Sequence, residues 1–179
     1  MAKSDSFFIR AGVTTNDATF TQSEIDLGSF VNLGVSKSTL LRIHNISVQY
    51  ADAASVSDRI SDDTGNNICF QLTTQTQSAM VYATDKSLVS SGSLQMYNGV
   101  IAEDGSAAAD YATAFVTQDM DVAPQQWTNG YLVGVDSMFL ATKAVGAITS
   151  GNVTVSIVLE CTLESATQAN SVALALSQQ

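Results

Sequence analysis

The chain has 179 residues, with 17 acidic and 7 basic side chains, a net charge of −10 and only 13% charged residues. Clustered Lys and Arg, which hold nucleic acid through its phosphates, are missing, and we expect no direct nucleic acid binding. Serine (22 residues) and threonine (18 residues) supply polarity instead. Length and composition therefore predict one domain, residues 1–179, with a hydroxyl-rich exterior.

The chain lacks segments typical of membrane insertion or export. No apolar run reaches the roughly 18 residues of a transmembrane helix. The start, MAKSDSFFIRAG, has a short apolar patch that ends at Arg10 and does not fit a secretory signal. We expect a protein that is not exported by that route. Cys69 and Cys161 lie within apolar strand patterns, which favours free, buried cysteines.

Alternation of apolar with polar residues recurs along the chain and predicts β-strands. Eight segments show it, separated by turn signals such as SDDTGNN and Thr-Asn-Gly. The eight predicted strands are 6–12, 18–27, 38–50, 67–76, 87–97, 111–118, 130–140 and 151–165. No ten-residue helical pattern separates successive strands, so strand–helix–strand units are not expected.

The segment 38–50 changes the side on which its apolar residues fall. Leu41 and Ile43 share one parity, whereas Ile46, Val48 and Tyr50 share the other. A β-bulge near Asn45 would keep the apolar side inward along one long strand.

The segment 151–165, GNVTVSIVLECTLES, is the most one-sided strand. Apolar residues occupy alternate positions from Val153 to Leu163, and mostly polar residues fill the gaps. Twelve such residues at about 3.3 Å each extend roughly 40 Å, which predicts an elongated body.

Two segments have helical character. One is 50–61, rich in Ala and Ser, and the other is the C-terminal segment, about 165–179. The second places Ala169, Val172, Ala173 and Leu176 at i, i+3, i+4 and i+7, with Thr167 as a plausible N-cap. The alternative is an extended C-terminal arm that lies on a neighbouring subunit.

These elements together predict an all-β fold, an eight-stranded antiparallel β-sandwich with a short helical or extended C-terminal segment. A single jelly roll fits better than an immunoglobulin-like domain, which needs only about 100 residues.

Catalytic chemistry has little support in the sequence. The only histidine, His44, lies within a strand without a Gly-x-Ser-x-Gly elbow, so we expect no catalytic residue, no cofactor and no His/Cys metal site. Acidic loops offer weak calcium candidates, and turn chemistry explains them equally well. The calcium candidates are Asp62, Asp63, Asp119 and Asp121.

Loops and termini are the expected places for subunit contacts. The only proline and the only tryptophan, Pro124 and Trp127, share one loop, where they either fix the loop or anchor an interface. The interface candidates are Pro124, Trp127, Asp104, Val172 and Leu176.

The chain resembles a single jelly-roll major capsid protein in the residue pattern of three segments, SFFIRAGVTT, TLLRIHNISVQYADA and GNVTVSIVLECTLES. The most similar family we name is the small capsid protein of icosahedral, internal-membrane-containing viruses of halophilic archaea (sphaerolipovirus-like). The resemblance implies an icosahedral shell built with a larger jelly-roll capsid protein. Membrane-associated virion proteins are further implied partners.

The sequence therefore predicts a non-enzymatic structural virion protein, a capsid subunit that associates with copies of itself and a larger sister protein and is assembled in the host cytoplasm. The alternatives are a carbohydrate- or receptor-binding β-sandwich module of a spike or surface protein, and a hydrolase that uses His44 on the same scaffold.

Overall fold

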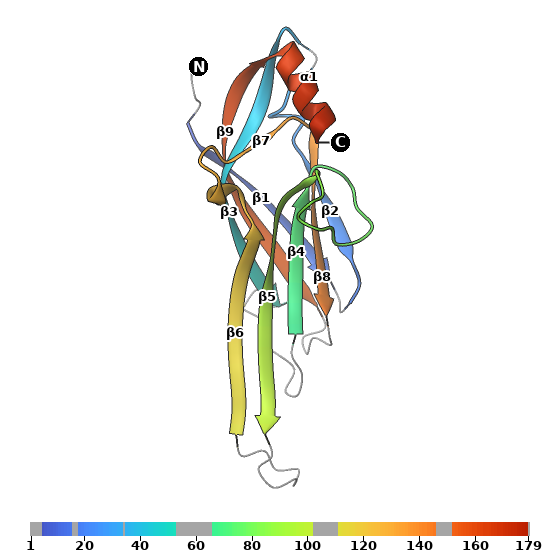
Figure 1. Ribbon diagram of the computed structural model, residues 1–179, viewed down its shortest axis with the longest axis vertical. Helices are drawn as coiled ribbons and strands as arrows, with labels where there is room; N and C mark the ends of the chain where they lie inside the picture. Colours follow the sequence, from blue (N-terminus) through green and yellow to red (C-terminus); the bar gives the residue numbers. More distant parts are fainter. Residues whose placement is uncertain are drawn as a thin grey trace.

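The computed structural model describes residues 5–15, 18–33, 35–52, 66–101, 111–145 and 152–178. It is a sandwich of two antiparallel sheets with one helix at an end (Figure 1). The first sheet has the order β1 (Phe7–Thr15), β9 (Val153–Thr167), β3 (Lys37–Asp52) and β7 (Tyr131–Val133). The second has the order β2 (Thr21–Asp26), β8 (Ser137–Val145), β4 (Asn66–Thr73), β5 (Leu88–Ile101) and β6 (Tyr111–Val122).

The order of the strands is that of a jelly roll. Apart from β6, the sheets β1-β9-β3-β7 and β2-β8-β4-β5 are the two faces of an eight-stranded double Greek key. The predicted fold class is confirmed. The prediction missed one strand because the segment 130–140 divides into β7 and β8, which lie in different sheets. The additional strand of the jelly roll, β6, extends the second sheet beyond β5.

Strand β9 holds the first sheet together, because it pairs with β1 on one side and β3 on the other. Its alternate residues from Val153 to Cys161 are buried, as the period of two predicts. The observed strand of 15 residues is even longer than the 12 residues from which its length was predicted.

The predicted bulge in β3 is confirmed. The register against β9 shifts between Ile43 and Asn45, so His44 is the additional residue. Leu41 and Ile43 before the shift and Ile46 and Tyr50 after it are all buried. The bulge thus keeps one face of a 16-residue strand turned inward.

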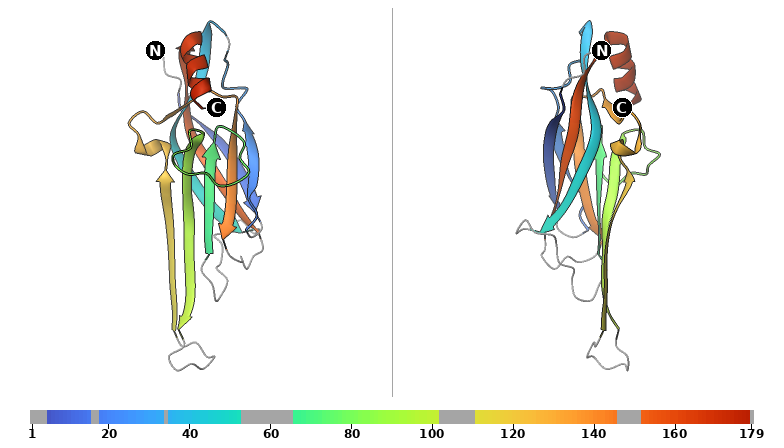
Figure 2. Two further views of the ribbon diagram at one scale, coloured as in Figure 1. Left: turned by 45° about the vertical axis from the view of Figure 1, so that its right-hand side comes forward. Right: turned by 90° about the vertical axis from the view of Figure 1, so that its left-hand side faces the viewer.

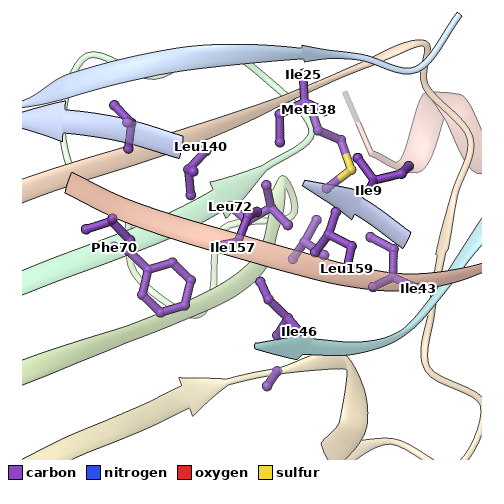
Figure 3. Packing of buried hydrophobic residues seen from close by; sticks show 14 of the residues in the cluster. Ile9, Ile25, Ile43, Ile46, Phe70, Leu72, Met138, Leu140, Ile157 and Leu159 are labelled. Atoms are coloured by element: carbon purple, nitrogen blue, oxygen red, sulfur yellow. The ribbon is translucent and has the colours of Figure 1, made fainter. Parts of the chain in front are cut away.

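The core lies between the sheets and is almost entirely apolar (Figure 3). Phe70 and Leu72 of β4 face Ile157 and Leu159 of β9 across it, and the Phe70 ring meets the edge of the Tyr50 ring at 6.5 Å between centroids. Each such buried side chain contributes about 1.5–3 kcal/mol to stability.

The C-terminal segment forms helix α1 (Gln168–Ser177), and its predicted N-cap is confirmed. The Thr167 hydroxyl accepts a hydrogen bond from the Asn170 backbone N–H at 3.4 Å. The other predicted helix, 50–61, is wrong at its start, because Tyr50 to Asp52 belong to β3. Residues 53–61 lie outside the described residues.

Gly130 is the glycine whose conformation the fold requires most directly. Its φ is +61°, and a Cβ atom there would lie 2.2 Å from the Ile43 carbonyl oxygen, beside the bulge. Any other residue would therefore suffer both backbone strain and a collision with main chain.

We predict that Gly130→Ala lowers the free energy of unfolding by about 2 kcal/mol or more, measured by urea denaturation. Gly12→Ala is the matched control, because its Cβ would find only ordinary contacts at 3.5 Å or more on an exposed strand position. Equal stability of the two variants would contradict this account of Gly130.

Candidate assembly surfaces

The loop after β6 carries two of the predicted contact residues. Pro124 begins the short helix η1 (Pro124–Gln126) and is buried, so its role is to fix the loop. Trp127 follows it, is 42% exposed, and has its ring 5.9 Å from the Tyr131 ring. Trp127 is therefore available for a contact, whereas Pro124 is not.

Arg42 of β3 connects this loop to the first sheet. The Arg42 guanidinium donates through Nε and Nη2 to the two carboxylate oxygens of Glu164, at 2.5 and 2.8 Å. Its Nη1 donates to the Asn129 carbonyl oxygen at 2.6 Å. The hydrogen bonds to Glu164 raise the pKa of Arg42. A bidentate pair of this kind holds both groups in a defined geometry.

Gln125 closes the edge of β3 beyond the bulge. Strand β7 pairs with β3 only from Leu41 to Ile43. At Ile46 the Gln125 side chain replaces a strand: its Oε1 accepts from the backbone N–H and its Nε2 donates to the carbonyl, both at 3.2 Å. Further along, Gln118 of β6 donates to the Val48 carbonyl at 3.3 Å. Side-chain amides therefore satisfy this part of the sheet edge.

Helix α1 is attached by hydrogen bonds and by Leu174, which packs beside Gly134. The Ser171 hydroxyl donates to the Ser38 hydroxyl at 2.9 Å, and both residues are buried. The Gln178 amide accepts from Gly134 N–H at 2.9 Å and donates to the Leu132 carbonyl at 2.6 Å. The Thr74 hydroxyl donates to the Gln178 carbonyl at 2.6 Å.

The predicted apolar stripe of α1 faces away from the body. Its four residues, Ala169, Val172, Ala173 and Leu176, are all exposed, with Val172 at 44% and Leu176 at 66%. Both helical contact candidates thus present apolar surface to the outside. Beneath the helix, a cavity of about 530 Å³ is lined by residues that include Leu40, Arg42, Leu132, Glu164, Asn170 and Leu174. This cavity could not be predicted from the sequence, because its walls come from four separate elements.

The β5–β6 hairpin projects beyond the sandwich. Among the described residues, β4 accompanies β5 as far as Met96, and residues 97–101 pair with residues 111–115 of β6 alone. Five residue pairs extend roughly 17 Å. Figure 2 shows this part, which we call the ribbon, as a single layer. Its sequence, YNGVI and YATAF, contains no charged residue.

The histidine and the two cysteines have structural surroundings in the described part of the chain. His44 Nε2 lies 2.9 Å from the Thr162 hydroxyl, with which it forms a hydrogen bond, as expected for a structural histidine. Both cysteines are free, as predicted; Cys161 is buried and Cys69 only partly so. Burial raises the pKa of Cys161 to about 12 and also raises that of Cys69, so neither is a thiolate at neutral pH.

Two of the four calcium candidates lie within the described residues. Asp119 and Asp121 are exposed on β6, and no group of three or more potential metal ligands occurs within the described residues. Asp62, Asp63 and Asp104 lie outside the described residues. None of the helical segments that the structure describes has the length and apolarity required to span a bilayer.

Comparisons with known proteins give structural likeness only. No family model matches the chain, and no curated protein sequence matches it. The VP1 of human polyomavirus 12, in complex with 3'-sialyllactosamine, is 10% identical with a TM-score of 0.45, covering 91% of this chain and 100% of that one.

Two further structures give similar values. The apo VP1 of New Jersey polyomavirus is 8% identical with a TM-score of 0.40, covering 90% of this chain and 100% of that one. The unassembled VP1 pentamer of Merkel cell polyomavirus is 9% identical with a TM-score of 0.37, covering 88% and 95%. These values assign no family to the chain.

We predict that Gln178→Ala releases the end of α1, because it removes two hydrogen bonds and leaves the Leu132 and Gly134 backbone groups without these partners. The expected loss is about 1–3 kcal/mol, seen as faster amide hydrogen exchange in α1 than in the sheets. Ser177→Ala is the control, because that hydroxyl bonds only within the helix, to Leu174. Unchanged exchange in the Gln178 variant would contradict the role assigned to this side chain.

Tyr50 allows a test of pH dependence. Its hydroxyl is buried and has no hydrogen-bond partner in the described part of the chain, and burial raises its pKa far above the ordinary value. Above about pH 10 the unfolded chain loses this proton while the native chain keeps it, so Tyr50 lowers stability as pH rises.

We therefore predict that Tyr50→Phe reduces the alkaline loss of stability in thermal melts above pH 10. At pH 7 the substitution should leave stability unchanged or raise it by up to about 1 kcal/mol, because an unpaired buried hydroxyl is removed. Tyr82→Phe, at an 86% exposed position, is the control. A marked loss at pH 7 in the Tyr50 variant would show that its hydroxyl has a partner.

Proposed function

We propose that this protein is a structural shell subunit, a single jelly-roll capsid protein whose work is to associate with copies of itself in a virion. The observation that carries the proposal is the ribbon of β5 and β6, which leaves the sandwich as a single uncharged layer. Exposed apolar side chains at separate places on the molecule give further support.

A ribbon of two strands is marginally stable in water on its own. None of the described strands lies beside the outer edge of β6, so part of its backbone hydrogen-bonding capacity is open within the described structure. Uncharged edges rich in β-forming residues pair with other chains unless they are protected. In a shell subunit, this open strand edge would form the contact with a neighbouring subunit.

Apolar surface also lies at several separate places. Phe8 on β1 is 55% exposed, Trp127 stands on the loop after β6, and Val172 and Leu176 stand on α1. One such patch would fit a dimer. Several patches on different elements fit a subunit with several neighbours, as closed shells require.

The charge pattern supports the same function. With 13% charged residues, the subunits present little like-charge repulsion to one another when packed closely. Because Lys and Arg are scattered along the sequence, we propose no direct contact with the genome.

The finer parts of the proposal come from the resemblance of the sequence. They are an icosahedral shell, assembly in the host cytoplasm, a larger jelly-roll capsid protein as partner, and membrane-associated virion proteins beneath the shell. We further propose that residues 1–179 act as one capsid domain and that the protein is not an enzyme.

A carbohydrate- or receptor-binding module is the second candidate. The exposed Trp127 ring beside Tyr131 is the feature that favours it, since aromatic faces with a polar neighbour suit such ligands. Titration with glycans, followed by the fluorescence of the only tryptophan, tests this function directly.

The ribbon provides the main experiment. Met96 and Val116 are opposite each other, so replacing residues 97–115 by Asn-Gly closes the hairpin at that pair. We predict that this variant keeps its β circular dichroism and loses assembly by at least about tenfold in sedimentation velocity, because it loses the uncovered strand surface.

The matched control keeps the ribbon. Ile101 and Tyr111 are also opposite each other, so replacing residues 102–110 by Asn-Gly shortens only the connection. This control also removes the interface candidate Asp104, so assembly like that of the unaltered chain would assign the contact to the ribbon, and lost assembly would assign it to residues 102–110. A lone monomer for the unaltered chain in sedimentation and electron microscopy would overturn the proposed function.

A further inference from the structure

We propose that the β6 edge of one subunit pairs with the β1 edge of the next copy of this chain, along the part of β6 that precedes Met120, because the Met120 carbonyl already accepts a hydrogen bond from Gln126. This inference deepens the proposed function and rests on it. Each sheet of the sandwich has two edges, and β6 and β1 are edges of different sheets. In Figure 1, β6 lies on the left and β2 on the right, whereas β1 crosses behind the other strands from upper left to lower right. A contact between two different edges joins copies head to tail.

The choice between β1 and β2 as acceptor follows from charge. Strand β6 carries Asp119 and Asp121, both exposed, near its C-terminal end, where the register against β5 shifts. Strand β2 carries Glu24 and Asp26, also exposed. Bringing β6 beside β2 of a neighbour would therefore place two acidic pairs together, which opposes association.

Strand β1 has the opposite character. It contains Arg10 and no acidic residue between Phe7 and Thr15. Arg10 is exposed and lies 5.9 Å from the centre of the Phe8 ring, and it forms no ion pair with any acid in the described ranges. Its charge is therefore available to a neighbour's Asp119 or Asp121.

The backbone of β1 suits strand addition. All nine of its residues pair with β9 on one side, and the described strands leave its other side without a partner. Phe8, Arg10, Gly12 and Thr14 are the exposed positions, so an incoming strand meets an apolar ring, a cation and two small residues. The new backbone hydrogen bonds would supply affinity, and the charges would select the edge.

Direction is compatible with this pairing. In Figure 1, β1 runs toward the end at which the ribbon projects, and β6 runs away from that end. Copies in the same orientation would therefore bring the two strands together antiparallel, which is the commoner form of strand pairing.

Charge reversal in the full chain tests the inference. Arg10→Glu alone, or Asp119→Lys with Asp121→Lys, should weaken assembly by about tenfold or more in sedimentation velocity. Combining all three substitutions should restore assembly. Glu24→Lys on β2 is the control and should leave assembly unchanged.

The outcomes separate this inference from the proposed function. If the unaltered chain assembles and the reversals have no effect, the β6–β1 pairing is overturned while self-association stands. If Glu24→Lys strengthens assembly, β2 is the acceptor instead. If the unaltered chain does not assemble, the proposed function fails first.

Cross-linking gives a second readout that does not depend on charge. In a Cys69→Ser background, Arg10→Cys and Asp119→Cys chains are mixed and treated with a short bis-maleimide. A head-to-tail contact predicts cross-linked dimers in the mixture and none in either variant alone. Dimers of Asp119→Cys alone would indicate a two-fold contact between β6 strands and overturn the inference.

Discussion

Backbone groups at the edges of a sheet need partners, and the way this protein meets that requirement shapes its surface. At the β3 edge the partner is the Gln125 amide, and beside Leu132 and Gly134 it is the Gln178 amide. Gln71 does the same for a loop, accepting from Val81 N–H at 2.8 Å and donating to the Ala79 carbonyl at 3.1 Å. An amide side chain suits this role because it carries both a donor and acceptors, as a peptide group does.

These amide contacts divide the edges into two kinds. The edge of β3 beyond the bulge is closed by Gln125 and Gln118, and the end of β6 is partly closed by Gln126, whose Nε2 donates to the Met120 carbonyl at 3.4 Å. The described residues show no such closure along β1. Because glutamine closes edges without adding charge, the sandwich can remain weakly charged and still restrict pairing to selected edges.

Local patterns predicted the fold well. The alternation of apolar and polar residues predicted β9, and the change of parity in β3 predicted the bulge. The capping residue Thr167 predicted the start of α1. The division between β7 and β8 was missed, because the apolar run through Val133 and Val135 continues while the chain passes from one sheet to the other. The passage of the chain from one sheet to the other does not alter the sequence pattern, so the pattern cannot predict it.

The candidate surfaces were only partly predictable. Trp127, Val172 and Leu176 were identified from composition and spacing, and they are exposed. Pro124 was identified by rarity alone, and rarity does not distinguish a buried residue from a contact. Arg10 and the excess length of β5 over β4 could not be found in advance, because both depend on which strands become neighbours.

The attachment of α1 determines how its exposed side is presented to other subunits. The hydrogen bonds of Ser171 and Gln178 are buried, so releasing them costs free energy, and Leu174 packs beside Gly134 as well. The helix is therefore held in place before any neighbour arrives. Because Val172 and Leu176 already stand at a defined place, a subunit that docks on them loses little conformational entropy.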